Sequence, residues 1–340
     1  MLETVRYLIG SVGDSGFGSK STGEEVTAAA PDLRSITAII TGATSGIGTE
    51  TARVLAMRGA RLVLPTRSLK TADEVKARIV AEIPDAEVIL LPLDLSSLSS
   101  VRCFVSLFLA LHLPLNLLIN NAGRMVYEHA VSEDGVEMTF ATNYLGHFLL
   151  TKLLLNKMAE TARETGIQGR IVNVSSHVHS WFSGDCLSYL DRITRKQIPY
   201  DATQAYALSK LANILHTKEL AERLKQMDAN VTANCVHPGV VRTRLNRDRE
   251  GFVTGGRDGV LRGDTPAAGR HLGEVLRRLQ RGLAVAVSFQ AARGGAAVAR
   301  LRVYDGYRSR PDRVRARTPA RIGPAGRREV TMGNLFSYVT

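Results

Sequence analysis

The chain has 340 residues, 44% of them hydrophobic, so it is long enough to bury a substantial core. Its formal net charge is +12, but residues 251–340 hold 17 Arg, no Lys and 6 acidic residues, so this end alone contributes a net +11. The 3 cysteines are far apart and odd in number. They exclude a complete disulfide framework and favour a reducing compartment.

Neither a secretory signal nor a membrane span is expected. The first ten residues include Glu3 and Arg6 and lack an apolar signal core, which predicts a protein that is not secreted. The most apolar window, 104–119, is interrupted by Pro114 and Asn116, and it is shorter than the ~20 residues of a membrane-spanning helix. Peripheral attachment to a membrane stays open.

The stretch 38–48 organises the rest of the chain. It is a β-branched apolar run that leads into a glycine turn, and a helical pattern follows over 49–58. A strand, a glycine turn and a helix N-terminus in this order expose backbone N–H groups and the positive end of the helix dipole, which suits a diphosphate. Gly42, Gly46 and Gly48 would allow the turn, the approach of the phosphates and close helix packing. An ordinary glycine-rich turn is the alternative.

From residue 36 onward, short apolar runs alternate with helical periodicity. Strands are predicted at 36–41, 62–65, 87–91, 115–120, 169–175 and 230–236. Helices are predicted at 72–83, 98–111, 132–159 (with an internal break) and 205–225, with a short one near 24–30. Buried strands separated by helices predict a three-layer, doubly wound α/β fold with a parallel sheet. Its ligands would bind at the carboxyl ends of the strands.

The end of the second strand indicates which dinucleotide is bound. An acidic residue there would bind ribose hydroxyls, but this chain has Arg67, with Arg61 and Lys70 nearby. A cation suits a 2′-phosphate, so the sequence favours NADP(H) over NAD(H). A solvated basic turn is the alternative.

Polar residues also follow the third and fourth strands. Asp94 could accept a hydrogen bond from an adenine amino group, or it could cap the helix that starts near Ser96. Residues 120–123 read Asn-Asn-Ala-Gly, which could tie neighbouring strand ends together beside a ligand or form a simple turn.

A candidate catalytic pair lies further on. Tyr206 and Lys210 are four residues apart in a helical pattern and so share one face. A free phenol, with a pKa of ~10, is a poor acid–base catalyst at neutral pH, and a nearby ammonium lowers that pKa. The pair could pass a proton while a cofactor passes a hydride, and a serine after the fifth strand could hold the substrate oxygen. Alone, such a pair is more often packing beside a solvated lysine.

Taken in order, these motifs closely resemble the short-chain dehydrogenase/reductase superfamily. They are Thr41-Gly42-x-x-x-Gly46-x-Gly48, Asp94, Asn120-Asn121-Ala122-Gly123, Asn143, Ser176, Tyr206-x-x-x-Lys210 and His237-Pro238-Gly239. The long gap between Ser176 and Tyr206, and the stretch 140–148, resemble the retinol-dehydrogenase-like and WW-domain-oxidoreductase-like branch. Residues 16–27 resemble plant members of the chloroplast inner-envelope translocon type. The resemblance covers about 15–252 and implies a Rossmann fold.

The resemblance implies a role for each matching position. Tyr206 would give and take the proton, and Lys210 would bind the nicotinamide ribose and lower the pKa of Tyr206. Ser176 would position the carbonyl, and Asn143 would hold a water in a proton relay. The residues expected to bind the cofactor are Gly42, Thr44, Ser45, Gly46, Ile47, Gly48, Arg67, Asp94, Leu95, Asn121, Ala122, Gly123, Tyr206, Lys210, Pro238, Gly239, Val241 and Thr243.

The sequence therefore predicts an NADP(H)-dependent oxidoreductase for a small apolar alcohol or carbonyl, such as a retinoid-, steroid- or lipid-like aldehyde. No metal is expected, because His177 and His179 have no partners at ligand spacing. A non-catalytic NADP(H)-binding redox sensor and a C-terminally damaged, inactive relative are the alternatives. The family resemblance also implies a homodimer formed through the Tyr206 helix, and a location in the cytoplasm or associated with chloroplasts.

We divide the chain into an N-terminal extension (1–30), an NADP-binding domain (31–252) and an atypical Arg/Gly-rich segment (253–340). In the last segment only 283–289 reads like a strand, and the family's substrate-side helix and last strand are not recognisable. Out-of-frame translation of GC-rich DNA and disorder are both consistent with this composition. An Arg-rich tail for nucleic acid or an anionic membrane is the alternative. With few aromatics and no recognisable module, we expect no nucleic-acid partner.

Overall fold

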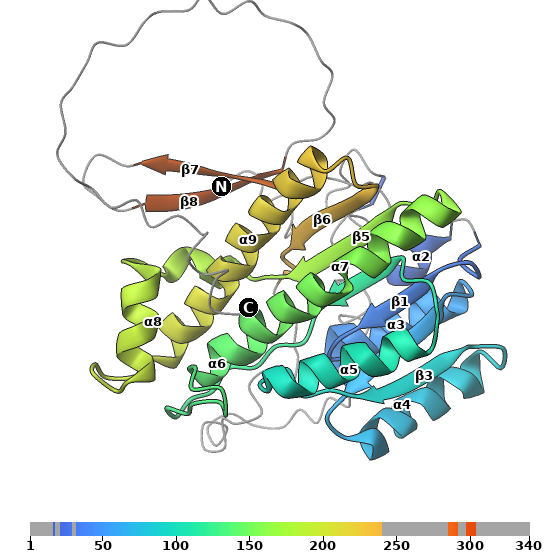
Figure 1. Cartoon of the computed structure of the whole chain (residues 1–340), viewed down its shortest axis with the longest axis horizontal. Helices are drawn as coiled ribbons and strands as arrows, with labels where there is room; N and C mark the ends of the chain where they lie inside the picture. Colours follow the sequence, from blue (N-terminus) through green and yellow to red (C-terminus); the bar gives the residue numbers. More distant parts are fainter. Residues whose placement is uncertain (1–15, 18–20, 29–31, 240–284, 292–296, 304–340) are drawn as a thin grey trace, which may run out of the picture. The chain divides into compact units, whose positions relative to one another are not determined.

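The computed structural model describes residues 16–17, 21–28, 32–239, 285–291 and 297–303. The chain divides into two compact units, Met1–Tyr304 and Asp305–Thr340, and every described residue belongs to the first. Its centre is a parallel sheet of six strands in the order β3-β2-β1-β4-β5-β6 (Figure 1). These strands are β1 (Thr37–Ile40), β2 (Arg61–Thr66), β3 (Val88–Pro92), β4 (Leu117–Asn120), β5 (Gly169–Val174) and β6 (Val231–Val236). The predicted doubly wound fold is confirmed.

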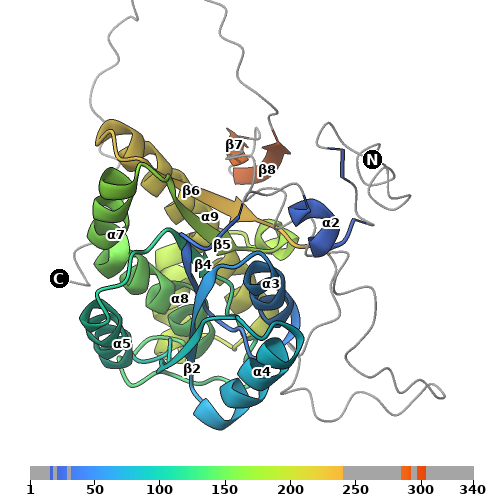
Figure 2. The same ribbon diagram turned by 90° about the vertical axis from the view of Figure 1, so that its right-hand side faces the viewer.

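Helices cover both faces of this sheet (Figure 2). One face carries α2 (Gly23–Thr27), α3 (Gly46–Met57) and α4 (Leu69–Glu82). The other face carries α5 (Leu98–Ala110), α7 (Gly146–Thr165) and α9 (Ala202–Gln226). None of the helices in the described ranges combines the length and apolarity needed to cross a membrane.

The sheet is buried because its strands are apolar on both faces. Ile40 and Leu62 point to the side where α3 and α4 supply Val54 and Ile79, and all four side chains are buried in one core cluster. The neighbouring strand residue Ile39 is also fully buried. This core fixes the carboxyl ends of the strands, where the candidate site lies.

The short helix α2 belongs to this core, although the sequence assigned it to the N-terminal extension. Its Val26 is fully buried in the core cluster. Its Glu24 pairs with Arg53 of α3, and Arg53 also donates hydrogen bonds to Glu50 at 2.7 Å and to Glu82 at 2.6 Å. The helix is thus fastened to α3 by an apolar contact and by an ion cluster.

The helix predicted over 132–159 begins later than expected. The structure has a short helix α6 (Met138–Phe140), then a π-helical turn η1 (Ala141–Leu145), and then α7. The start is fixed by Glu137, whose carboxylate accepts hydrogen bonds from the N–H groups of Thr139 and Phe140, both at 2.8 Å. The predicted internal break is the π-helical turn. Two helical elements in the described part of the chain were not predicted, the 3-10 helix η2 (His177–Trp181) and the helix α8 (Cys186–Thr194).

After residue 239 the structure describes two strands, β7 (Val285–Ala291) and β8 (Ala297–Val303), which pair antiparallel. The sequence predicted only one strand here, and that part of the prediction was wrong. The prediction took only the continuous apolar run at 283–289 and overlooked the alternation of Arg300 and Arg302 with apolar residues, which is a period-two strand pattern. The other predictions for 253–340 lie outside the described residues.

Candidate active site

The loop between β1 and α3 has the geometry that a diphosphate requires. Gly42 and Gly46 have positive φ angles of 69° and 57°. A Cβ on Gly48 would lie 2.4 Å from the carbonyl oxygen of Gly42, so only glycine fits there. Ser45 is the N-cap of α3, but its side chain makes no capping hydrogen bond. The first N–H groups of α3, at Gly46 and Ile47, are therefore open to an anion.

The loop after β4 is joined to this glycine loop. The N–H groups of Asn121 and Ala122 donate to Thr41 Oγ1 at 2.9 and 3.0 Å, and Asn121 Nδ2 donates to the carbonyl oxygen of Thr41 at 2.9 Å. Asn120 Nδ2 donates to Asn173 Oδ1 of β5 at 2.8 Å. Both amides thus tie neighbouring strand ends together, and Gly123 is left exposed at the edge of the loop. This is the point where the strand order reverses, where such sheets bind ligands.

The basic residues near the second strand do not all lie together. Arg67 follows the carboxyl end of β2 and is exposed, and Lys70 is exposed in the first turn of α4. Arg61 lies at the opposite end of β2, where it pairs with Glu87. Arg61 therefore lies away from the end of β2 that carries Arg67.

The structure separates the two interpretations of Asp94. Its Oδ1 accepts hydrogen bonds from the N–H and the hydroxyl of Ser96, at 2.9 and 2.7 Å. The N-cap of α5 is Ser97, so Asp94 is not the capping residue. The neighbouring Leu95 is buried. The carboxylate of Asp94 is half-buried beside the end of β3, where an adenine could reach it.

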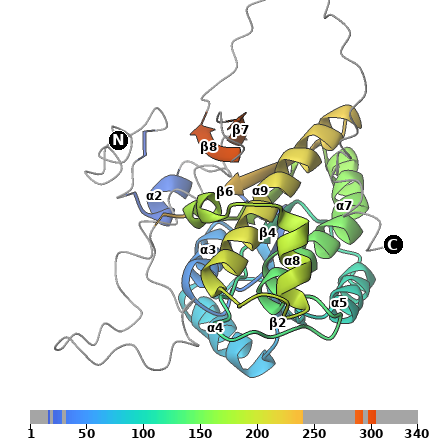
Figure 3. The same cartoon turned by 90° about the vertical axis from the view of Figure 1, so that its left-hand side faces the viewer.

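Three of the predicted catalytic residues meet at the carboxyl end of β5. Ser176 follows this strand, and its side chain lies close enough to the Tyr206 hydroxyl of α9 to lower the pKa of that phenol. Lys210, one turn further along α9, places Nζ 5.5 Å from the centroid of the Tyr206 ring. Figure 3 looks onto α9, which packs against β5 and β6. The serine, the phenol and the ammonium therefore form one group.

Burial changes the titration of this pair. Desolvation raises the pKa of Tyr206 to about 12, although the nearby side chain of Ser176 lowers that pKa. Burial lowers the pKa of Lys210 to about 8, since Lys210 is only 3% exposed. The sequence predicted a lowered pKa for Tyr206. In this structure desolvation of the phenol is the largest effect, so the pKa of Tyr206 is raised instead.

Asn143 lies in the π-helical turn η1 and is fully buried. Its side chain is anchored, because Oδ1 accepts from the N–H of Arg124 at 2.8 Å and Nδ2 donates to Ser209 Oγ at 3.1 Å. Its carbonyl oxygen accepts from His147 Nδ1 at 3.1 Å and from Asn213 Nδ2 at 3.3 Å. Two donors fill the two lone pairs of this carbonyl. A water would bind there only after the longer bond, from Asn213, is broken.

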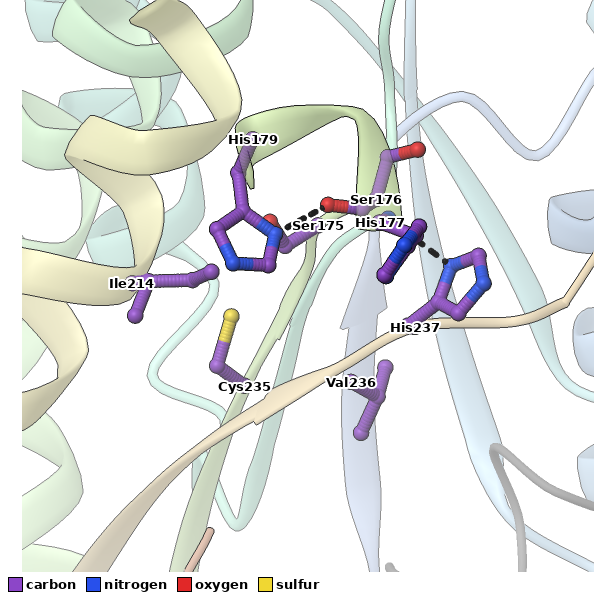
Figure 4. Close-up of a pocket in the computed structure, with 8 residues that line it drawn as sticks. All are labelled: Ser175, Ser176, His177, His179, Ile214, Cys235, Val236 and His237. Carbon is purple, nitrogen blue, oxygen red and sulfur yellow. Dashed lines mark hydrogen bonds between the residues drawn. The ribbon is translucent and has the colours of Figure 1, made fainter. Parts of the chain in front are cut away.

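A pocket opens beside Ser176 (Figure 4). Its lining combines histidines with apolar side chains and a thiol, from Ser175, Ser176, His177, His179, Ile214, Cys235, Val236 and His237. His179 Nδ1 donates to the carbonyl oxygen of Ser176 at 2.6 Å, and the N–H of His177 donates to His237 Nδ1 at 3.3 Å. The sequence singled out His177 and His179 near the end of β5 but gave no signal for Ile214 and Cys235.

The remaining predicted residues follow β6. Pro238 and Gly239 are described, while Val241 and Thr243 lie outside the described residues. Of the two aromatic residues that follow His179 in this segment, Trp181 is exposed and Phe182 is buried. Among the described residues, no group of three or more His, Cys, Asp and Glu side chains could hold a metal ion.

The sequence pattern of the short chain dehydrogenase family matches residues 36–183. Over 248 residues the chain is 49% identical to "Short-chain dehydrogenase TIC 32 A, chloroplastic" of Brassica napus, which covers 72% of this chain and 76% of the relative. The chain belongs to the short-chain dehydrogenase family. It is thus an oxidoreductase of a family that uses NAD(P)(H). It is also 42% identical over 213 residues to retinol dehydrogenase 12 of Bos taurus, covering 62% of each chain.

Solved structures agree with this family fold. A crystal structure of an uncharacterized protein from Mycobacterium paratuberculosis superposes with a TM-score of 0.56 at 32% identity, covering 74% of this chain and 78% of that one. Levodione reductase superposes with a TM-score of 0.50 at 24% identity, covering 63% and 75%. In this short-chain dehydrogenase, the glycine loop and the Ser176–Tyr206–Lys210 group are the parts that the family fold brings to one edge of the sheet.

Proposed function

We propose that the chain is an NADP(H)-dependent oxidoreductase that transfers a hydride between nicotinamide and an apolar alcohol or carbonyl. The observation that carries this proposal is the meeting of Ser176, Tyr206 and buried Lys210 at the end of β5. The loop at Gly42–Gly48 fits the cofactor, because its glycines leave no room for a Cβ and the N–H groups of α3 lack a side-chain cap. Bound there, the cofactor would supply or accept the hydride.

The protein would supply the proton. The Ser176 hydroxyl would donate a hydrogen bond to the substrate oxygen. In reduction, Tyr206 would give its phenolic proton to that oxygen, and its raised pKa keeps the proton on the phenol at neutral pH. The Lys210 ammonium would stabilise the phenolate that is left.

Lys210 would also organise the proton path. One of its three N–H donors is used on the carbonyl oxygen of Val174, at 2.9 Å. The other two would serve the nicotinamide ribose and a water chain. Asn143 would hold the next water of that chain after its carbonyl is released by Asn213.

Arg67 would set the cofactor preference. It is exposed at the end of β2, and within the described part of the chain no carboxylate is paired with it. A guanidinium binds a 2′-phosphate in a bidentate way, so we infer a preference for NADPH.

The names of the relatives support the proposed substrate class and location. Retinol dehydrogenases support an apolar substrate, and the chloroplastic relatives support a chloroplast location.

The test begins with thermal stability, because a ligand that binds the native state raises the melting temperature. NADPH should raise it more than NADH, and Arg67→Glu should reverse this order while Lys70→Ala should not. Turnover is then measured with retinal, steroid ketones and medium-chain aldehydes. Tyr206→Phe should lose turnover by about 10²–10⁴-fold and keep NADPH binding.

Two outcomes contradict the proposal in different ways. A chain that is stabilised by NADPH but shows no turnover that depends on Tyr206 would be a non-catalytic NADP(H)-binding protein. A chain that is stabilised by neither nucleotide would lack the cofactor site altogether.

A further inference from the structure

A buried histidine outside the proposed catalytic group connects its two halves. His147 lies in the first turn of α7 and is 3% exposed. Its Nε2 is 2.9 Å from Thr41 Oγ1, at the base of the glycine loop. Its Nδ1 is 3.1 Å from the carbonyl oxygen of Asn143 in the π-helical turn. The imidazole thus joins Thr41 to Asn143, and its bond to Thr41 spans 106 positions of the sequence.

The partners decide which nitrogen carries the proton. A carbonyl oxygen only accepts, so Nδ1 must be the donor to Asn143. Complete burial lowers the pKa of His147 to about 4, helped by the positive charge of Lys210, so the ring is neutral. Nε2 then carries a lone pair, and the Thr41 hydroxyl donates to it. This leaves the oxygen of Thr41 free to accept the two N–H groups of Asn121 and Ala122.

Each bond in this chain orients the next. The hydroxyl of Thr41 has a single proton, and the carbonyl oxygen of Ile119 is a more distant acceptor at 3.3 Å. The shorter contact to His147 therefore directs the lone pairs of Thr41 toward the loop after β4. At the other end, the ring holds the carbonyl of Asn143 together with Asn213 of α9.

We propose that His147 is a positioning residue that couples the cofactor loops to the Asn143 turn through a neutral imidazole protonated at Nδ1. The inference rests on the function proposed above. The loops that would receive the cofactor and the turn that would serve the proton relay then share one hydrogen-bonded ring. Loss of the ring would loosen both at once.

Four substitutions at this position separate the two bonds. His147→Phe keeps the ring shape and removes both bonds. His147→Asn offers an amide at the position of Nδ1 and keeps only the bond to Asn143, while His147→Gln reaches toward Thr41 and keeps only that one. His147→Leu removes the ring. The matched control is His216→Phe, because His216 is another buried histidine but packs edge-on against Tyr144 and Phe148.

We expect His147→Phe to weaken the Kd for NADPH about tenfold, the loss of one buried hydrogen bond. His147→Gln should recover cofactor affinity more than kcat, and His147→Asn should recover kcat more than affinity. His216→Phe should bind NADPH as the wild type does. In a double-mutant cycle, Thr41→Val combined with His147→Phe should bind NADPH no more weakly than the weaker of the two single variants.

A second readout follows the histidine rings directly. Nitrogen-15 NMR of the wild type should show, among the rings with their proton on Nδ1, one that stays neutral from pH 7 down to pH 5.5 and is absent in His147→Phe. A proton on Nε2, additive losses in the cycle, or unchanged NADPH affinity in His147→Phe would each overturn the inference. If the wild type itself fails to bind NADPH, the proposed function fails. The NMR experiment then still tests whether His147 forms the hydrogen bonds to Thr41 and Asn143.

Discussion

Lys210 Nζ donates a hydrogen bond to the carbonyl oxygen of Val174 at 2.9 Å, so helix α9 is fastened by its lysine to the last residue of β5. A second bond runs in the opposite direction, from Ser175 Oγ to the carbonyl oxygen of Lys210, also at 2.9 Å. Ser176 follows directly in the chain. These two bonds therefore set the position of the serine hydroxyl relative to Tyr206.

The first prediction concerns the cost of burying this lysine. Burial lowers the pKa of Lys210 to about 8, which means that the folded state pays a desolvation cost for the charged ammonium. Lys210→Met should therefore change the free energy of unfolding by no more than about 1 kcal/mol, since the loss of the bond to Val174 opposes the relief of desolvation. The rate of carbonyl reduction should nevertheless fall by about 100-fold or more.

The matched control is Lys218→Met, an exposed lysine on the same helix. It should leave both the melting temperature and kcat close to the wild type. A large drop in melting temperature for Lys210→Met, together with a normal kcat, would show that the lysine is structural only.

A second prediction tests the glycine loop. In Gly48→Ala the new Cβ would lie 2.4 Å from the carbonyl oxygen of Gly42 and 2.6 Å from Asn121 Nδ2. The loop must move, so NADPH affinity should fall by about 100-fold, measured by fluorescence titration. Gly135→Ala is the control. That glycine also has a positive φ, 75°, but a Cβ there meets nothing within 4 Å. It should lose some stability and keep its affinity for NADPH.

Local patterns were sufficient to predict the sheet and the positions of the site. The glycine turn after β1 and the four-residue spacing of Tyr206 and Lys210 are features of neighbouring residues, and the parallel fold then determines where they meet. Strand boundaries were right to within one or two residues because the apolar runs are short and end at polar residues.

What could not be predicted depends on contacts between distant residues. The raised pKa of Tyr206 is a result of tertiary burial, which the spacing to Lys210 does not reveal. The start of the helix at Met138 depends on Glu137, a buried acid that accepts a hydrogen bond from Tyr200 at 2.9 Å. The bridge from His147 to Thr41 likewise spans 106 residues.

A third prediction concerns helix α2. Val26 is fully buried against the core, and Arg53 joins α2 to α3 and α4. In Val26→Asp an unpaired carboxylate would replace this contact, so α2 should detach. The free energy of unfolding should fall by about 2–4 kcal/mol, read from urea denaturation. Glu25→Ala removes only an exposed capping contact at the start of α2 and should cost about 1 kcal/mol. Equal effects of the two substitutions would mean that α2 is not part of the core.

The last prediction concerns acid. Burial lowers the pKa of both His147 and His216 to about 4, against about 6.5 for an unfolded histidine. Between these values the unfolded chain binds protons that the folded chain does not, so stability falls as the pH falls from about 6.5 toward 4. At pH 5 each of these two histidines should lower the free energy of unfolding by about 2 kcal/mol relative to pH 7. In urea denaturation, His216→Phe should restore about 2 kcal/mol of the free energy of unfolding at pH 5 and none at pH 7.5. His112→Asn, at an exposed position, should restore none at either pH. Equal pH dependence in wild type and His216→Phe would show that this histidine is not held neutral by the fold.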